Sequence, residues 1–254
     1  MKIDNNQPLD LENFWRIISA KARQVQSSGK IPILITDLDG TLIDYSQRSY
    51  QIFQQALRTY DLPESIVKLV NSINPENYDY FPKNNLTRLG IPDQHIITQL
   101  TEFWDKHYFT NQYLHFDLPI PGALDFIANI ASLDINIVYL TGRDEQNMGD
   151  GTRVWLSQHG LMNNNGKPCR LLMKTNLGYD NAYSKFNNSE TISALGLPIL
   201  IVDNEPLDIQ TLSERFPLAL TVLIETTNSG KIAVLPQNLL RLKNYIKINS
   251  IFKR

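Results

Sequence analysis

Short apolar runs rich in β-branched residues alternate with helical patterns along most of this 254-residue chain. Runs of this kind fit strands that are buried on both faces of a parallel sheet. They are Ile31–Thr36, Ile135–Leu140, Leu171–Met173, Ile199–Val202 and Leu218–Ile224. Helical patterns follow at residues 122–131, 152–159, 183–195 and 205–216. Strands that alternate with helices predict an α/β fold, in which a parallel sheet carries helices on both faces.

Residues 45–118 interrupt this alternation. Apolar residues recur at helical spacing within 52–60, behind Pro63 and behind Pro92, and no strand-like run lies among them. A block of helices between two strands of a parallel sheet predicts an inserted α-helical cap domain. We therefore divide the chain into residues 1–44 (N-terminal helix and first core strand), 45–118 (α-helical insert) and 119–254 (remainder of the core).

The N-terminus predicts a tail and a helix, and no targeting segment. Residues 1–8 are polar and are expected to be disordered. With Asp10 as N-cap, apolar residues at helical spacing predict a helix that stops before Gly29. No apolar segment follows a basic start, and no apolar run is long enough to cross a bilayer. We therefore expect no membrane partner and a cytoplasmic location.

The bulk composition argues against a dedicated nucleic-acid-binding protein and against a protein stabilised by internal disulfides. The net charge is -2, so the chain lacks the basic surface of a dedicated nucleic-acid binder. Its only cysteine, Cys169, cannot form an internal disulfide and gives no sign of an oxidising compartment.

A pair of aspartates follows the first predicted strand. Residues two apart on a strand face the same side, so Asp37 and Asp39 can point at one ligand above the carboxyl end of the strand. Gly40 allows a sharp turn directly behind them. Two close carboxylates repel, which leads one of them to keep a proton or the pair to hold a metal ion. Both outcomes suit phosphoryl chemistry, with Asp37 as nucleophile and Asp39 as proton donor. A solvated Asp-Gly turn is the simpler alternative.

The segment Asp37-Leu-Asp39-Gly40-Thr41 resembles the first motif of the haloacid dehalogenase-like superfamily, and the later motifs of that family follow in order. The resemblance covers roughly residues 30–44 and 118–224. It implies a Rossmann-like core with an α-helical cap inserted between the first and second motifs. It also implies Mg²⁺ as the cofactor.

The segment from Val138 to Arg143 is similar to the second motif in the acid-phosphatase and polynucleotide-phosphatase branches of that family. The Thr141 hydroxyl and nearby backbone N–H groups can hold phosphate oxygens, and the bend at Gly142 leaves room for them. Arg143 has two interpretations, a contact with the phosphate of the substrate or a salt bridge across the core.

The acidic fourth motif is matched by Asp203, which ends the fourth strand-like run. The resemblance implies that Asp203 binds Mg²⁺ together with Asp37 and the backbone carbonyl of Asp39. Many members carry a second Asp where this chain has Asn204, so we expect weaker metal binding or help from the acidic residues that follow. A helix N-cap is the simpler role for Asp203.

One lysine is expected to neutralise the nucleophile and the phosphate, and there are two candidates. Lys174 ends the predicted strand 171–173, whereas Lys185 lies early in the helix before Asp203. By resemblance to members with the same second motif, we favour Lys185 as the catalytic lysine and place Lys174 among the substrate-binding residues.

The resemblance implies a Mg²⁺-dependent phosphomonoester hydrolase that acts through an aspartyl-phosphate on a small phosphorylated metabolite. A phosphate at a nucleic-acid end stays open as a substrate. One alternative is a phosphomutase of the same superfamily, which needs a second phosphate site in its lid. The basic residues of the predicted lid are scattered, which favours hydrolysis. The other alternative is a catalytically idle binding protein on the same fold. The substrate and the oligomeric state are not fixed by the sequence.

Overall fold

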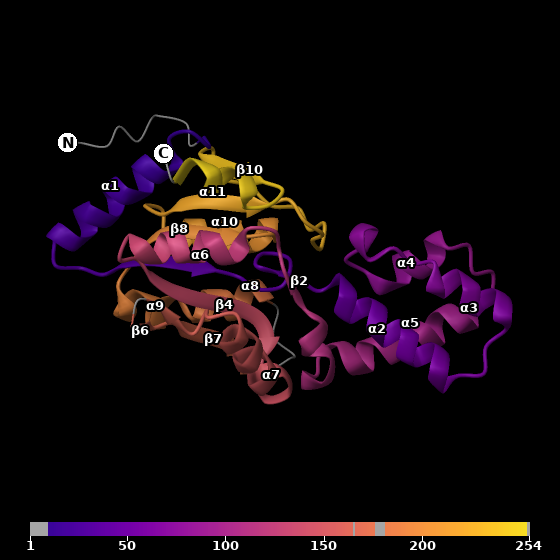
Figure 1. The fold of residues 1–254 in the computed structure, drawn as a ribbon. Coiled ribbons are helices and arrows are strands. Elements are labelled where there is room, and N and C mark those ends of the chain that lie inside the picture. Colours follow the sequence, from indigo (N-terminus) through magenta and orange to yellow (C-terminus); the bar gives the residue numbers. More distant parts are fainter. Residues whose placement is uncertain (1–9, 165, 176–180, 253–254) are drawn as a thin grey trace.

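A six-stranded sheet forms the centre of the computed structural model, which describes residues 10–164, 166–175 and 181–252 (Figure 1). Its strand order is β10-β9-β8-β1-β4-β7, and each neighbouring pair is parallel. The strands are β1 (Pro32–Thr36), β4 (Asn136–Asp144), β7 (Arg170–Lys174), β8 (Leu197–Asp203), β9 (Leu220–Ile224) and β10 (Leu239–Leu242). The expected Rossmann-like α/β fold is confirmed. Residues 1–8, the predicted disordered tail, lie outside the described residues.

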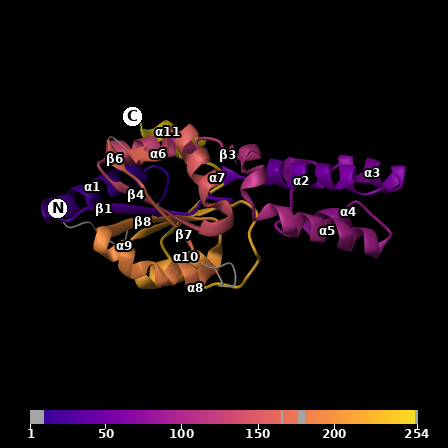
Figure 2. The same cartoon turned by 90° about the horizontal axis from the view of Figure 1, so that it is seen from below.

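Helices cover both faces of this sheet, because successive side chains of a buried strand point to opposite sides. On one face, Leu34 of β1 packs in a core with helices α1 (Phe14–Ser27), α6 (Ala123–Ser132), α7 (Glu145–Gln158) and α11 (Ile246–Phe252). On the other face, Ile33 and Ile35 pack with α9 (Ser189–Leu195) and α10 (Pro206–Arg215). Figures 1 and 2 show the sheet between these two layers.

Several boundaries differ from the sequence-based expectation. Asp10 is not the N-cap of α1, which begins at Phe14 behind Asn13. Asp10 and Asn13 instead exchange side-chain hydrogen bonds with each other's backbone N–H in the preceding turn. The helix expected over 183–195 is divided into α8 (Asn181–Asn187) and α9. Strand β10 and helix α11 were not expected, and a two-stranded ribbon of β5 (Asn163–Asn164) and β6 (Lys167–Pro168) precedes β7.

Residues 46–116, between β1 and β4, contain helices and no strand, and we call them the helical insert. Its elements are α2 (Ser46–Thr59), α3 (Glu64–Asn71), η1 (Pro75–Asn77), α4 (Pro82–Arg88), α5 (Gln94–Tyr108) and η2 (Asn111–Phe116). They pack around an apolar cluster of their own, and the insert projects from the sheet away from both chain ends (Figure 2). A short antiparallel ribbon of β2 (Ile43–Asp44) and β3 (Leu118–Pro119) joins it to the core. No helix in the described ranges is long and apolar enough to span a membrane.

Candidate active site

The predicted site residues gather at one edge of the sheet. Strands β8, β1 and β4 are neighbours and parallel, so their carboxyl ends lie side by side. Asp37 follows β1, Thr141 lies near the end of β4, and Asp203 ends β8. A cavity of about 490 Å³ opens above this edge. Its lining includes Asp37, Asp39, Thr141, Gly142, Arg143, Lys174 and Lys185.

A buried lysine holds three carboxylates together at the floor of the cavity. Lys185 Nζ lies 2.7 Å from Asp203 Oδ2, 2.7 Å from Asp208 Oδ2 and 3.3 Å from Asp37 Oδ1. Burial alone would lower the pKa of Lys185, but the carboxylates, Asp203 and Asp208 foremost, outweigh it and raise the pKa well above its usual range. The lysine is therefore a fixed positive charge beside the carboxyl group of Asp37.

The carboxyl group of Asp37 is only partly compensated by this lysine. Desolvation on burial is the main cause that raises the pKa of Asp37 to about 6; Lys185 lowers this pKa, and the neighbouring Asp39 and Asp208 act with desolvation. An additional positive charge at this position would hold Asp37 in the ionised form that a nucleophile needs.

The donor set at this position fits a magnesium ion. Three carboxylates face a single ammonium group, so the buried cluster carries excess negative charge on oxygen ligands, which Mg²⁺ prefers. Asp37 and Asp203 both contact Lys185 and are thus near one another. Among the described residues no three His, Cys, Asp or Glu side chains converge as a metal-binding group. The set implied by resemblance needs only two side chains and the Asp39 carbonyl.

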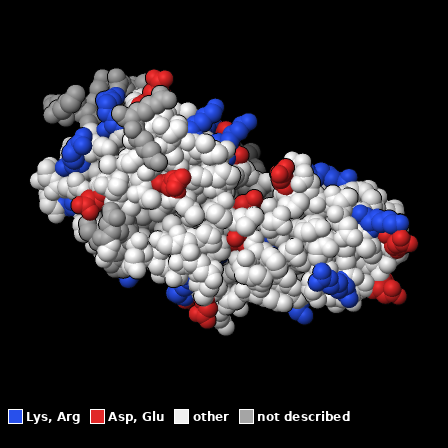
Figure 3. Space-filling view, in the orientation of Figure 1, with Lys and Arg blue, Asp and Glu red and all other residues white. Residues whose placement is uncertain are grey.

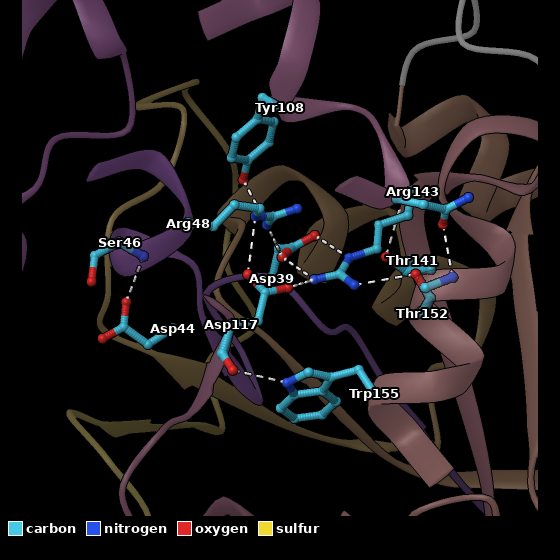
Figure 4. Close-up of polar contacts among 12 residues, drawn as sticks. Asp39, Asp44, Ser46, Arg48, Tyr108, Asp117, Thr141, Arg143, Thr152 and Trp155 are labelled. Carbon is cyan, nitrogen blue, oxygen red and sulfur yellow. Dashed lines mark hydrogen bonds and ion pairs between the residues drawn. The ribbon is translucent and has the colours of Figure 1, made fainter. Parts of the chain in front are cut away.

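The side chain of Asp39 is bound by two arginines (Figure 4). Arg143 donates from Nε to Asp39 Oδ2 and from Nη2 to Asp39 Oδ1, both at 2.7 Å. Arg48, from α2 of the helical insert, donates to Asp39 Oδ1 at 2.6 Å. Burial alone would raise the pKa of Asp39, but the two guanidinium groups outweigh it and hold the pKa well below its usual range. In this arrangement Asp39 is a carboxylate, which accepts a proton and has none to donate.

The same two arginines share a second carboxylate. Asp117, directly before β3, lies 2.6 Å from Arg143 Nη2 and 3.0 Å from Arg48 Nε. Tyr108 at the end of α5 accepts a hydrogen bond from Arg48 at 3.1 Å. Sequence reasoning missed Tyr108 and Asp117, and it counted Arg48 only as one of several scattered basic residues of the predicted lid. The sequence signal that could have identified Arg48 and Asp117 is their position, because they lie where the chain leaves and re-enters the core.

The structure shows Arg143 in a buried salt bridge, the second of its two expected interpretations, and a contact with the phosphate of a substrate stays a prediction. Its guanidinium is buried between Asp39 and Asp117 and also donates to Thr152 Oγ1 of α7 at 3.2 Å. The side chain therefore positions Asp39 here, while its atoms still line the cavity.

The segment around Thr141 is shaped to approach a ligand. The pairing of β4 with β7 is interrupted between Leu140 and Asp144, so the backbone of Thr141 and Gly142 departs from the regular ladder. Thr141 is buried, and its hydroxyl oxygen accepts a hydrogen bond from Arg143 N at 3.2 Å. Lys174, at the end of β7, is buried at the cavity wall.

Asn204 has a structural role that an aspartate could not fill. Its backbone N–H donates to Thr41 Oγ1 at 3.0 Å, and its Oδ1 accepts from the same hydroxyl at 3.1 Å. Its Nδ2 donates to the carbonyl oxygen of Thr227 at 2.8 Å, where a carboxylate would place oxygen against oxygen. Gly40 has φ +76°, and a Cβ there would collide with the Asn204 amide. The departure from the family pattern thus accompanies a tight contact between the loops behind β1 and β9.

The sequence matches a model of haloacid dehalogenase-like hydrolases over residues 31–159, just over half of the chain. This range contains the aspartate pair, the helical insert and the Thr141 segment. No curated protein matches the chain in sequence.

Solved structures share the fold across most of the chain. A putative phosphatase from Clostridium difficile superposes with a TM-score of 0.58 at 11% identity, covering 87% of this chain and 98% of the other. Protein tyrosine kinase A from Mycobacterium tuberculosis gives 0.57 at 13% identity, covering 89% and 99%. A predicted phosphoglycolate phosphatase from Haemophilus somnus gives 0.51 at 13% identity, covering 87% and 97%.

Proposed function

Because the chain belongs to the haloacid dehalogenase-like hydrolase family, we propose that it hydrolyses phosphomonoesters with Asp37 as the covalent nucleophile. The observation that carries the proposal is the contact of Asp37 with the buried Lys185, 3.3 Å away, at the floor of a cavity. A carboxylate and a phosphate dianion repel, and a fixed ammonium beside both lowers that cost.

The proposed reaction has two steps. In the first, a carboxylate oxygen of Asp37 attacks phosphorus, the ester P–O bond breaks, and the leaving oxygen takes a proton that Asp39 has gained from solvent. In the second, water attacks the phosphorus of the aspartyl-phosphate, the bond between Asp37 and phosphorus breaks to release inorganic phosphate and the free carboxylate, and Asp39 accepts the proton of the water. The two arginines keep Asp39 ionised, which supports its proposed role as proton acceptor in the second step. To donate a proton in the first step, it would have to exchange at least one arginine contact.

Mg²⁺, held by Asp37, Asp203 and the Asp39 carbonyl, would supply the remaining positive charge that neutralises the phosphate. The side chain of Asp39 is occupied by Arg48 and Arg143, which leaves its backbone carbonyl for this purpose. Thr141 and the adjacent backbone N–H groups would orient the phosphate oxygens.

The helical insert is proposed to act as the cap that selects a small phosphorylated metabolite. Its side chains form the part of the cavity wall that faces the aspartates. The names of two structural neighbours, a putative phosphatase and a predicted phosphoglycolate phosphatase, are consistent with phosphoester hydrolysis on this fold. Hydrolysis is preferred to phosphomutase chemistry because the insert contributes no Lys or Arg to the cavity lining, all residues of the insert being described.

The test is the hydrolysis of p-nitrophenyl phosphate with Mg²⁺, with excess EDTA, and by Asp37→Asn. We expect turnover that requires the metal ion and the aspartate. Undiminished turnover in EDTA would contradict the metal requirement, and undiminished turnover by Asp37→Asn would contradict the nucleophile.

The assignment of the lysine is tested by Lys185→Ala and Lys174→Ala. Loss of the ammonium beside Asp37 should lower kcat about a hundredfold or more, since a positioned charge at such a site is worth about 3 kcal/mol. Lys174→Ala should change KM more than kcat. The opposite pattern would exchange the two roles.

A further inference from the structure

The cavity above Asp37 has one charged side and one aromatic side. The core side carries the aspartates and lysines of the candidate active site. The opposite side is lined by six aromatic residues of the insert and its joint: Tyr45, Tyr80, Phe81, Trp104, Tyr108 and Phe109. A phosphate at Asp37 would therefore have its ester group directed toward aromatic rings.

These rings form continuous packed surfaces. Trp104 stacks on Tyr108 with ring centroids 4.0 Å apart, and Phe109 meets Tyr108 edge-on at 5.0 Å. Phe81 meets Tyr80 edge-on at 5.0 Å. The Tyr108 ring also lies against the Arg48 guanidinium, 4.1 Å from the ring centroid, so Trp104 and Tyr108 form a packed base. The ring surfaces open to a further ring belong to Phe81 and Phe109.

Two of these rings are left open to solvent at the cavity. Phe81 is 49% exposed and Phe109 is 41% exposed, and both line the same pocket. Apolar rings that line a concave site and stay accessible are typical of a surface that a ligand covers.

The aromatic side offers little to a strongly polar leaving group. Beside the tyrosines, Asp105 is the only ionisable residue that the fully described insert contributes to the lining, and it is an acid. On the face of the insert seen in Figure 3, the Lys and Arg side chains lie apart from one another and form no basic patch. A second phosphate would find no cation there, whereas a planar ring would find stacking partners.

We propose that the substrate is a phosphomonoester whose leaving group carries a planar aromatic ring, stacked on this aromatic wall while the phosphate lies at Asp37. The inference rests on the proposed phosphohydrolase function and specifies its substrate class. Two kinds of compound share this chemistry. In aryl phosphates the ring bears the ester oxygen, and in nucleoside monophosphates a sugar separates ring and phosphate.

Binding is measured by calorimetry, which does not depend on turnover. Phenylphosphonate is compared with cyclohexylphosphonate, which has a similar size but no aromatic ring. Adenosine 5′-monophosphate is compared with ribose 5-phosphate, with Mg²⁺ replaced by Ca²⁺ to suppress hydrolysis. We expect the aromatic member of at least one pair to bind about tenfold more tightly, the gain typical of one good aromatic contact. The pair that shows the gain identifies the kind of compound.

Phe81→Ala and Phe109→Ala locate the effect. Both side chains are half-exposed, so their removal leaves the cores intact. We expect each change to weaken the aromatic ligand about fivefold while the affinity for inorganic phosphate stays unchanged. Phe186→Ala is the matched control, because Phe186 is 48% exposed and is not among the residues that line the cavity.

The outcomes separate this inference from the proposed function. Equal affinities within both pairs, or aromatic affinity that is insensitive to both wall variants, would overturn the aromatic assignment even if the protein hydrolyses p-nitrophenyl phosphate. If the aromatic ligands bind more tightly but p-nitrophenyl phosphate is not hydrolysed, the aromatic wall keeps its assignment as a binding surface and the proposed phosphohydrolase function is contradicted. Absence of binding by all four ligands and by inorganic phosphate would overturn both.

Discussion

Asp37 and Asp39 are two residues apart and occupy opposite electrostatic environments. Asp37 is buried beside other carboxylates and one lysine. Desolvation on burial outweighs the lysine and raises the pKa of Asp37 to about 6. Asp39 faces two arginines, which outweigh burial and depress its pKa. A group with a raised folded-state pKa and a group with a depressed one contribute to stability at opposite ends of the pH range.

For Asp37 the metal-free protein should gain stability when the carboxylate is removed. A raised folded pKa gives a contribution that is complete below the unfolded pKa of about 4 and is lost as the pH rises through about 6. Asp37→Asn should therefore match the wild type near pH 4 and exceed its free energy of unfolding by about 1–3 kcal/mol at pH 7.5. Urea denaturation in EDTA at both pH values measures this. A variant that is less stable at pH 7.5 would show that the Lys185 contact outweighs desolvation.

For Asp39 the expected sign is the reverse. A depressed folded pKa gives a contribution that is present above the unfolded pKa of about 4 and is lost as the pH falls below it. Asp39→Asn leaves two buried arginines that share one carboxylate, so we expect the free energy of unfolding to fall by about 3 kcal/mol at pH 7. The difference in free energy of unfolding between Asp39→Asn and the wild type should become smaller as the pH falls toward 3. A constant difference across this range would mean that the loss comes from packing and not from charge.

At the scale of elements, the ion-pair network joins the two ends of the helical insert to the core. Arg48 comes from α2 where the chain leaves the sheet, and Asp117 lies where it returns before β3. Arg143, near the end of β4, contacts Asp117 from the core side. The carbonyl of Asp117 also accepts a hydrogen bond from Trp155 of α7 at 2.9 Å. The orientation of the insert over the aspartates thus depends on buried charge pairs.

Asp117→Asn should consequently destabilise the protein more than an ordinary loss of a salt bridge. Removing one partner of a buried pair leaves uncompensated charge and costs about 3–5 kcal/mol. Glu64→Gln is the control, because its ion pair with Lys68 on α3 is exposed and worth less than about 1 kcal/mol. Denaturant midpoints of both variants provide the comparison. A similar small effect in both would show that the Asp117 pair contributes nothing beyond a surface contact.

At the scale of the whole molecule, the sheet was predictable because its strands are buried on both faces. Five of the six strands appear as apolar runs, and the helices between them fix the parallel order. Strand β10 was missed because it has four residues, with an exposed Arg241 among three leucines. The aspartate pair and Asp203 follow strand ends, so their meeting at one sheet edge could be deduced without coordinates.

The network around Asp39 could not be predicted in the same way. Arg48 and Asp117 are far apart in sequence and meet only because α2 and β3 start and end the insert at the same edge. The aromatic wall has a similar origin, since Tyr80 precedes α4, whereas Trp104 and Phe109 lie at the end of α5. Periodicity identifies Trp104 as buried, but its place on a cavity wall depends on how the insert packs over the core.

Asp37 is proposed to form a covalent bond to phosphorus during turnover. The most direct measurement is mass spectrometry of acid-quenched protein during turnover of p-nitrophenyl phosphate with Mg²⁺, followed by digestion. We expect a phosphoryl group on the peptide that contains Asp37 in the wild type, more of it in Asp39→Asn, and none in Asp37→Asn. Phosphorylation of another residue, or steady turnover by Asp37→Asn, would contradict this proposal.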